Sequence, residues 1–435
     1  MNAHTNIPAE QVQGGGDYTT VQVEQRATLS GWHIGTILLG ALIALPAFMM
    51  GSELGNGLGA RGALIASLAG GLVVTLIALP GAIAGARSRL SSYMLIIETF
   101  GTLGGKCINV ALSLSVLGWF GIISMMFGAA MKGAAGGALA HISPAVWALG
   151  GCVLMTITNL IGIKALDILS IFATPLKVCL LLGAAWAAFR MAHGELPALP
   201  GGTHYTVATG ISIVVGGIAI GVVLLPDITR YARSSWHAAV SCALAIGVGF
   251  PAILVLSGYP SLVTHERDLV PIMLKLGLGA PAMAVILFSS WSTNTYNLYQ
   301  STLMWSSVVR QPRWRIALAT GIVGTVSGLL GIGEQLMQYL LALSVAIPPV
   351  GGVYLIDFYL FSQTGVSRRA PRQWRWSAFI AWALGVGLAV LEGLVPFTLS
   401  TVPAIDSLVL SAIAYPLIQL LLKGRPGAVE QATLQ

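Results

Sequence analysis

The chain has 435 residues, of which 56% are hydrophobic and only 9% are charged. A soluble globular protein carries about 25% charged residues, so a soluble enzyme of this length would lack the polar side chains that its surface needs. The formal net charge is +7, but the cations are scattered between apolar stretches and do not form the basic, aromatic-rich face of a nucleic-acid binder.

Twelve apolar stretches are long enough to cross a bilayer, for which about 20 residues suffice. In chain order they are 32–58, 60–84, 104–130, 143–163, 165–190, 206–227, 236–259, 276–300, 314–333, 335–361, 374–395 and 400–422. The polar residues before them lack the short apolar core of a signal peptide. The sequence therefore predicts an all-α membrane protein with twelve transmembrane helices.

The distribution of Lys and Arg predicts the orientation in the membrane, because cytoplasmic loops carry an excess of both. With the N-terminus in the cytoplasm, fifteen cations fall on the cytoplasmic side and five on the other. The cytoplasmic set is Arg26, Arg87, Arg89, Lys164, Arg230, Arg233, Arg310, Arg313, Arg315, Arg368, Arg369, Arg372, Arg375, Lys423 and Arg425. The opposite set is Arg61, Lys132, Arg190, Arg267 and Lys275. We expect a multi-pass protein of the cytoplasmic (inner) membrane with both termini in the cytoplasm.

The sequence carries no signature of catalysis or of a transition-metal site. The four cysteines stand singly, the seven histidines have no metal-ligand spacing, and neither a nucleophile elbow nor a phosphate-binding loop occurs. The sequence predicts no enzyme activity, no organic cofactor, no nucleic-acid partner and no obligate protein partner. The expected partners are a small substrate and the lipid bilayer.

Helix-breaking residues inside two of the stretches indicate a binding site within the membrane. In the stretch 32–58 the segment Gly40–Glu53 contains Pro46 and two glycines and ends at Glu53, and the stretch 206–227 contains three glycines from Gly216 to Gly221. Either set alone is equally well explained by close helix packing. Irregular backbone is tolerated in a bilayer only where it is buried in protein or lines a cavity. Because the two interrupted stretches stand five apart, they predict an inverted five-plus-five repeat with discontinuous first and sixth helices.

The predicted organisation follows from this repeat. We expect a cytoplasmic tail over residues 1–31, a first five-helix repeat over 32–192, a second over 206–361, a C-terminal helix pair over 374–422 and a tail over 423–435.

Three features inside the membrane suggest chemistry. The stretch from Ser289 to Asn297 contains seven Ser, Thr and Asn side chains in nine residues, more than bonding back to the helix explains. Their oxygens suit a small cation, and an Asn suits a planar ligand. Trp119 lies in mid-span between two glycines, where its ring either stacks on a heterocycle or packs in the core. Lys177 lies in an apolar run, where an ammonium costs at least ~2.5–3.5 kcal/mol, and is a candidate for proton coupling.

The chain resembles the nucleobase:cation symporter-1 family, and within it the cytosine permeases, over nearly all of residues 30–425. The segments that carry the resemblance are Gly118–Gly121, Trp291–Asn294, Asp227 with Arg230 and Arg233, and, most specifically, Ala346–Val353 followed by Asp357–Tyr359.

The resemblance implies a LeuT-like fold of five plus five helices with two further C-terminal helices, working by alternating access. It implies a sodium site formed by carbonyls of Gly40, Ile43 or Ala44 with Ser289, Ser292 and Thr293. It places the stacking indole on Trp119 and the base-binding amide on Asn294. The rest of the implied binding site comprises Gly217, Ile218, Ile220 and Ala47.

Two departures bear on the substrate and the coupling ion. Where cytosine permeases have serine, phenylalanine and serine, this chain has Gly217, Ile218 and Ile220. A site that loses hydrogen-bonding groups loses its selectivity for the ligand that used them. Cytosine permeases have a small apolar residue at Lys177, whereas in proton-coupled relatives of the fold a lysine occupies the neighbourhood of the sodium site. The coupling ion is therefore open between Na⁺ and H⁺.

The sequence thus predicts a secondary transporter that imports a nucleobase, cytosine-like or purine-like, or a related planar heterocycle by cation symport. One alternative keeps the fold and carries a hydantoin, allantoin, a hydroxymethylpyrimidine or an amino acid. The other is a membrane receptor that binds without transport.

Overall fold

The computed structural model describes residues 21–135, 139, 141–195, 205–267, 269–331, 343, 345–362, 372–395, 399–400 and 402–423. Most of the predicted tails 1–31 and 423–435 and part of the stretch 335–361 lie outside the described residues, as do Arg368, Arg369 and Arg425. Apart from one isolated bridge between Leu29 and Ala232, the regular structure of the described residues is helical.

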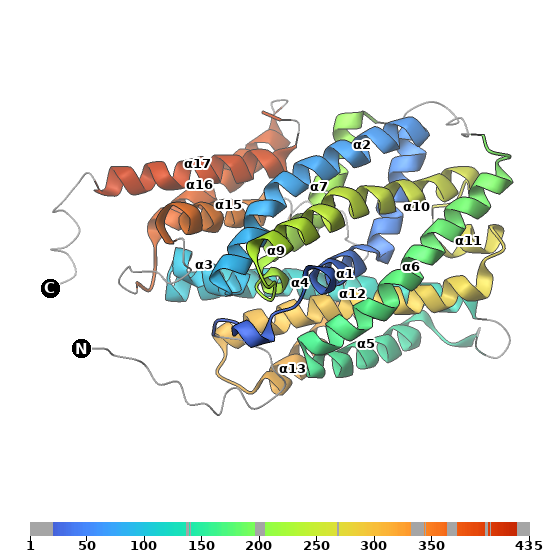
Figure 1. Cartoon of the computed structure of the whole chain (residues 1–435), viewed down its shortest axis with the longest axis horizontal. Helices are drawn as coiled ribbons and strands as arrows, with labels where there is room; N and C mark the ends of the chain where they lie inside the picture. Colours follow the sequence, from blue (N-terminus) through green and yellow to red (C-terminus); the bar gives the residue numbers. More distant parts are fainter. Residues whose placement is uncertain are drawn as a thin grey trace.

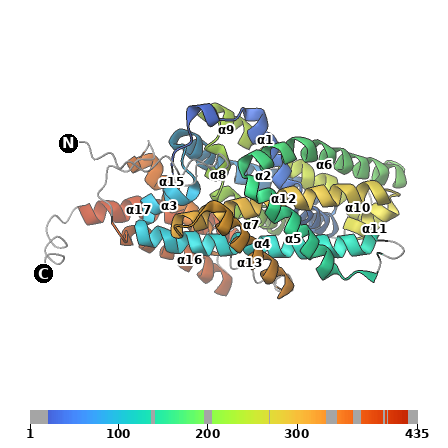
Figure 2. The same ribbon diagram turned by 90° about the horizontal axis from the view of Figure 1, so that it is seen from below.

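The helices follow the predicted apolar stretches and, for the most part, run along the long axis of the molecule (Figures 1 and 2). They are α1 (Gly31–Leu42), α2 (Leu45–Ser88), α3 (Ser92–Phe100), α4 (Thr102–Ala134), α5 (Pro144–Ile161), α6 (Ile163–Met191), α7 (Val207–Val223), α8 (Pro226–Thr229), α9 (Ser235–Cys242), α10 (Phe250–Thr264), α11 (Leu269–Lys275), α12 (Gly279–Val308), α13 (Arg313–Leu329), α15 (Pro348–Asp357), α16 (Trp376–Leu394) and α17 (Pro403–Lys423). A π-helical stretch, Ala243–Gly249, joins α9 to α10 without a break.

The first predicted span is interrupted where the sequence indicates. Helix α1 ends at Leu42, Ala44 is extended (φ −138°, ψ 162°), and α2 begins at Leu45. Pro46 lies in the first turn of α2, where a missing N–H costs nothing.

Helix α2 contains the first loop between spans as well. At about 1.5 Å per residue its 44 residues would extend about 66 Å, roughly twice the thickness of a bilayer core. Gly59 has φ 69° and ψ 173°, a conformation that glycine adopts without strain, and it divides α2 into two parts. The two parts run in different directions in Figure 1, so they correspond to the end of the first predicted span and to the second.

The predicted break within the glycine run of the sixth span is wrong. Helix α7 continues unbroken through Gly216–Gly221 and ends at Val223. A glycine in a helix costs about 1 kcal/mol but does not by itself end the helix. The interruption lies further on, at Leu224 and Leu225, because Pro226 has no N–H with which to continue the helix.

The packing brings together helices that are distant in sequence. Helix α2 packs on α7 and α10, α12 packs on α4 and α6, and α17 packs on α15 and α16. Large apolar side chains face outward along α2, at Leu64, Leu68, Leu72 and Leu76. Among the described helices, six are long and apolar enough to cross a membrane. A belt of outward apolar side chains on such helices is the surface of a protein embedded in lipid.

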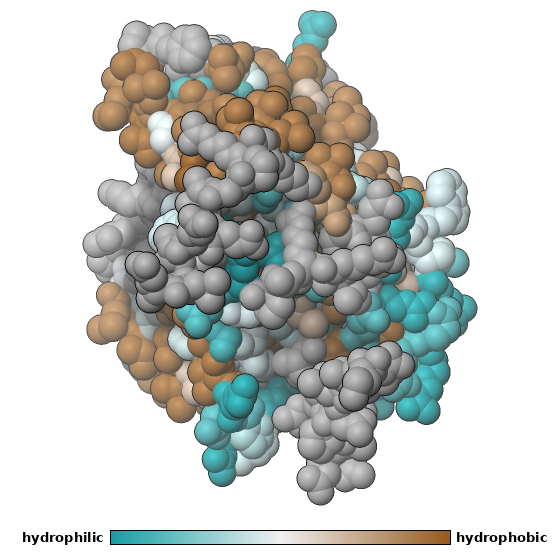
Figure 3. Space-filling model, turned by 90° about the vertical axis from the view of Figure 1, so that its left-hand side faces the viewer, coloured by the Kyte–Doolittle hydropathy of each residue, from teal (hydrophilic) through white to brown (hydrophobic). Residues whose placement is uncertain are grey.

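Three of the cations that the sequence assigns to the cytoplasm are tied by hydrogen bonds to neighbouring segments. The Arg89 carbonyl accepts from the Val23 N–H at 3.1 Å, and the Arg375 N–H donates to Phe100 at 3.0 Å. Arg313 donates through Nη2 to the Asn159 carbonyl at 3.0 Å. Figure 3 views the end of the molecule at which α3 lies, where hydrophilic side chains gather towards the lower right and apolar ones along the upper and left-hand edges.

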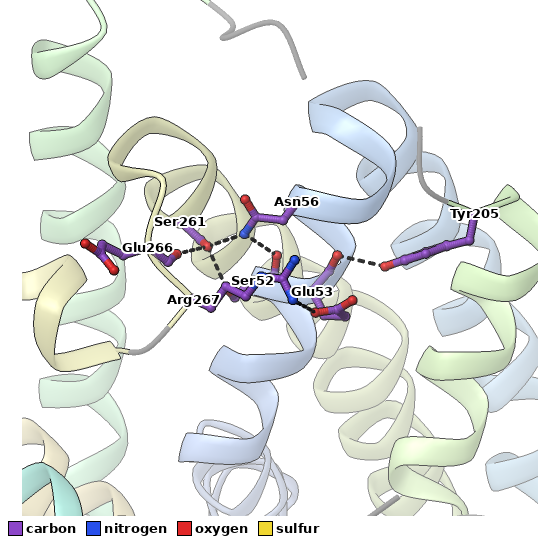
Figure 4. A network of polar contacts seen from close by, with 7 residues as sticks. All are labelled: Ser52, Glu53, Asn56, Tyr205, Ser261, Glu266 and Arg267. Atoms are coloured by element: carbon purple, nitrogen blue, oxygen red, sulfur yellow. Dashed lines mark hydrogen bonds and ion pairs between the residues drawn. The ribbon is translucent and has the colours of Figure 1, made fainter. Parts of the chain in front are cut away.

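At the other end, a polar network ties the first part of α2 to α10 and to the segment after it (Figure 4). Ser261 bonds to Ser52 at 2.5 Å and accepts from Asn56 Nδ2 at 2.7 Å. The ion pair Arg267–Glu53, at 3.6 Å, and the bond from Tyr205 to the Glu53 carbonyl, at 2.7 Å, extend this network towards α7.

Candidate substrate and cation site

The break after α1 leaves carbonyl groups without a helical partner, as every helix end does. Side chains from two other helices satisfy three of them. The Gly40 carbonyl accepts from Lys177 of α6, the Ala41 carbonyl from Thr293 of α12, and the Ile43 carbonyl from Ser289 of α12. The break thus joins α1, α6 and α12, which lie side by side (Figure 2).

Lys177 lies at the centre of the predicted cation site. Its Nζ donates to the Gly40 carbonyl at 2.7 Å, to Ser292 Oγ, and to the Ser289 carbonyl at 3.4 Å. The side chain is 0% exposed. Among the ion pairs of the described residues, none pairs Lys177 with a carboxylate. An ammonium group with neutral oxygen partners therefore occupies the place where the sequence predicts a cation.

The other predicted cation ligands lie around this group. Ser289 Oγ donates to the Ile43 carbonyl at 2.7 Å, and Thr293 Oγ1 donates to the Ala41 carbonyl at 3.3 Å. The Ala44 carbonyl accepts from the N–H groups of Ala47 and Phe48 at the start of α2, so it is used by the helix. Ala41, which the sequence interpretation missed, supplies its carbonyl to this cluster.

A cavity of about 130 Å³ lies beside the break. Like the predicted cation site, it is lined in part by residues of α1 and α12. Five predicted binding residues line it, namely Ala47, Trp119, Gly217, Ile218 and Ile220. The remaining lining residues are Leu38, Ala41, Leu42, Ala44, Pro46, Met50, Ile123, Gly221, Val222, Leu225, Ile246, Phe250, Thr293, Tyr296 and Asn297. The wall is largely apolar, and none of these described residues is acidic or basic.

Asn294 lies behind the wall and does not line the cavity. Its Nδ2 donates to the Phe120 carbonyl at 3.0 Å and to Ser124 Oγ at 2.9 Å, both on α4. The amide that lines the cavity belongs to Asn297, which the sequence interpretation missed. The helical period contains the missing signal, because Thr293, Tyr296 and Asn297 are spaced i, i+3 and i+4 and share one face of α12.

The glycines of α7 make room at the opposite wall. A Cβ atom at Gly217 would lie 2.2 Å from Met50 Cε, whereas one at Gly221 would meet no atom of the described residues within 4 Å. The space beside Gly221 is therefore open to a ligand. An apolar chamber with a few polar groups on one wall and an indole at its edge suits an uncharged planar molecule.

A multi-pass membrane permease with a site at a broken helix is the class of protein that these features define. Comparison with known families agrees. Over residues 20–415 the sequence matches the family described as permeases for cytosine/purines, uracil, thiamine and allantoin, and the chain belongs to that family. The predicted resemblance is thereby confirmed.

Relatives and solved structures agree with this assignment. A cytosine permease of Escherichia coli strain K12 is 29% identical over 387 residues, which is 87% of this chain and 90% of the relative. The closed structure of Mhp1, a nucleobase-cation-symport-1 transporter with bromovinylhydantoin bound, superimposes with a TM-score of 0.81 at 16% identity, covering 96% of this chain and 98% of Mhp1. A Na⁺-coupled sialic acid symporter gives 0.61 at 14% identity over 89% of this chain and 90% of that chain. The fold is therefore that of this transporter class.

Proposed function

We propose that the protein is a secondary transporter that imports an uncharged nucleobase or a related planar heterocycle, coupled to H⁺, by alternating access. The observation that supports H⁺ as the coupling ion is the position of the Lys177 ammonium among the Gly40, Ser289 and Ser292 oxygens. We place the protein in the cytoplasmic membrane with both termini in the cytoplasm, and we assign it no enzyme activity.

The cavity supports an uncharged substrate. Its described lining includes no acidic or basic side chain, so a zwitterionic amino acid would find no charged partner there. In our proposal Trp119 stacks on the ring, and the polar face of α12 binds its edge. The relatives are named for cytosine transport and, for Mhp1, contain a hydantoin. The apolar Gly217, Ile218 and Ile220 favour a ring other than cytosine, with a hydantoin or allantoin as the leading alternative.

The cation site supports H⁺ over Na⁺. Two unit charges about 4 Å apart repel by about 4 kcal/mol at an effective dielectric constant of about 20. The ammonium already uses two carbonyls and a hydroxyl that a sodium ion would need. The site therefore holds one cation at a time, and Lys177 supplies it when protonated.

Alternating access would use the same contacts. Protonated Lys177 ties α6 to the end of α1 and to α12. The neutral amine has one N–H fewer and no charge, so loss of the proton weakens all three bonds. We propose that proton release towards the cytoplasm lets α1 separate from α6 and opens the cavity on that side.

The proposed architecture retains the twelve spans and the inverted repeat. The second span packs on the seventh, where Gly71 faces Pro251 and Thr75 faces Gly247, and the third packs on the eighth, as α4 on α12. Partners that stand five apart are expected to meet in this way around a pseudo-two-fold axis. The repeat thus has support from packing, although the interruptions of the first and sixth spans differ in form.

Uptake by the purified protein in proteoliposomes tests this function. Radiolabelled cytosine, uracil, hypoxanthine, allantoin and hydantoin are offered with and without an inward pH gradient, in Na⁺ or in choline. We expect accumulation of at least one ring that depends on the pH gradient and is the same in both salts. Protein-free liposomes are the control. Accumulation that requires Na⁺ at fixed pH would overturn the assignment of H⁺, and accumulation of none of these rings would overturn the substrate class.

A further inference from the structure

A buried amide behind the cavity wall has fixed hydrogen-bond directions. Asn294 is 0% exposed, and its Nδ2 donates to the Phe120 carbonyl at 3.0 Å. Because a carbonyl only accepts, the atom of Asn294 that faces it must be the nitrogen. Ser124 Oγ donates to the same carbonyl at 2.7 Å, so its oxygen accepts from Asn294 Nδ2, at 2.9 Å. The amide nitrogen of Asn294 therefore faces α4, and Oδ1 is left to accept elsewhere.

The Asn294 Oδ1 atom accepts a hydrogen bond from the next amide side chain along α12. Asn297 Nδ2 donates to Asn294 Oδ1 at 3.3 Å. The nitrogen and oxygen of a carboxamide lie on opposite sides of one planar group, so holding Asn297 Nδ2 turns Asn297 Oδ1 away from Asn294. Asn297 lines the cavity and Asn294 does not.

We propose that Asn297 is the residue that hydrogen-bonds the transported ring, and that Asn294 is a positioning residue that directs the Asn297 carbonyl oxygen towards it. This inference rests on the proposed function and deepens it. The hydrogen bonds that run from the Phe120 carbonyl through Asn294 to Asn297 leave Asn297 Oδ1 as a hydrogen-bond acceptor at the cavity wall. The ligand must therefore present an N–H group at this position.

Tyr296 adds a donor to the same wall. The Gln300 Nε2 atom donates to the Leu224 carbonyl at 3.4 Å, which identifies it as the nitrogen, and it donates to the Tyr296 hydroxyl oxygen at 3.3 Å. The phenol proton of Tyr296, which lines the cavity, remains for the ligand. An acceptor at Asn297 and a donor at Tyr296 complement a ring that carries both an N–H and a carbonyl. The substrate class is therefore a lactam-type heterocycle with an unsubstituted ring nitrogen.

Methylation of that nitrogen provides the test. Uracil, cytosine and hydantoin are each compared with their ring N-methyl derivatives by calorimetric titration of the full-length protein in detergent. The measured quantity is the ratio of the dissociation constants of derivative and parent ring. For the nitrogen that Asn297 binds, we expect a ratio of about tenfold or more in the wild type, because a methyl group leaves the Asn297 acceptor without a donor in the occupied cavity.

The variants separate positioning from packing. In Asn297→Ala the ratio should fall to about one, and in Asn294→Ala it should fall by about threefold or more, although Asn294 does not touch the ligand. Asn294→Ser, which keeps a small polar side chain but is too short to reach Asn297, should behave like Asn294→Ala. The control is Thr295→Val on the same helix, since the buried Thr295 hydroxyl has no hydrogen-bond partner among the described residues, and it should keep the wild-type ratio.

Each outcome decides a different claim. If Asn294→Ala and Asn294→Ser weaken parent and derivative alike and keep the ratio, Asn294 only supports the packing of α4 on α12 and the inference is wrong. If Asn297→Ala keeps the ratio, Asn297 does not bind the ring nitrogen. If the wild-type protein binds none of the three parent rings, the proposed substrate class itself fails, and this inference fails with it.

Discussion

Replacing Lys177 by methionine separates the structural role of the ammonium from its role in coupling. Methionine keeps the length of the side chain and removes its charge. The change relieves the cost of an ammonium in the membrane, ~2.5–3.5 kcal/mol. It also removes the bonds to Gly40 and Ser292, each worth about 1.5–3 kcal/mol because the donor is charged. The balance is a destabilisation of about 0–3 kcal/mol, so we expect Lys177→Met to fold with a modestly lower melting temperature.

We expect Lys177→Met to abolish the accumulation of substrate along a pH gradient. A pH difference of about one unit represents about 1.4 kcal/mol per proton, enough for an accumulation of about tenfold with one proton per substrate. In proteoliposomes we expect this accumulation for the wild type and a ratio of about one for Lys177→Met. Exchange of substrate at equal pH on both sides should persist in the variant, since the cavity does not include Lys177. If Lys177→Met still concentrates substrate along a pH gradient, the proton is carried elsewhere and the reasoning is refuted.

Three further predictions concern the cavity and the break. Trp119→Leu should weaken binding of every transported ring by about tenfold, because stacking on the indole is lost, whereas Trp119→Phe should lose less; direct titration measures both. Gly221→Val should fold normally and abolish binding, because in the part of the chain that the structure describes a Cβ there meets no atom within 4 Å, and its methyl groups would fill the cavity. Gly183→Val on α6 is the matched control, since its Cβ is equally unobstructed and Gly183 does not line the cavity; equal loss of binding in both would count against the site. Ser289→Ala should lower stability by about 1–3 kcal/mol in a thermal-unfolding assay, because the Ile43 carbonyl loses its donor; an unchanged melting temperature would contradict the role given to this bond.

The membrane class and the first break could be predicted because their signals are local. Apolar length specifies a span, and Pro46 after a short helix specifies a new helix start. The glycine run of α7 was misinterpreted for a physical reason. Glycine permits a break but does not require one, and the neighbouring turns of α7 satisfy every backbone group through Gly216–Gly221. Proline lacks the N–H outright, so Pro226 was the stronger signal for the interruption at Leu224 and Leu225.

The orientation of side chains around the site could not be predicted from the sequence alone. Asn294 and Asn297 both belong to the polar stretch of α12, and only tertiary packing decides which faces α4 and which faces the cavity. The sequence identified Lys177 by its cost in lipid. It contained no information on the partners of the ammonium, because Gly40 and Ser289 are 137 and 112 residues away and contribute backbone carbonyls.

The surroundings of Lys177 and the cavity are both built from α1 and α12. In the proposed mechanism, these shared helices are the physical route by which substrate is coupled to the proton. On α1, the Gly40 carbonyl binds Lys177, while Leu38, Ala41 and Leu42 line the cavity. On α12, Ser292 binds Lys177, while the adjacent Thr293 lines the cavity. A displacement of α1 relative to α12 therefore changes both sites at once.

Such a connection acts in both directions. If protonation of Lys177 favours the arrangement of α1 and α12 that encloses the cavity, then substrate that binds the enclosed cavity must favour protonation by the same factor, because a coupling free energy between two sites is reciprocal. Neither the proton nor the substrate then crosses alone at an appreciable rate, since each occupies the closed arrangement weakly without the other. The extended residue Ala44 lies between α1 and α2, and between the Lys177 partner Gly40 and the lining residue Ala47, so the proposed mechanism uses this break as its hinge.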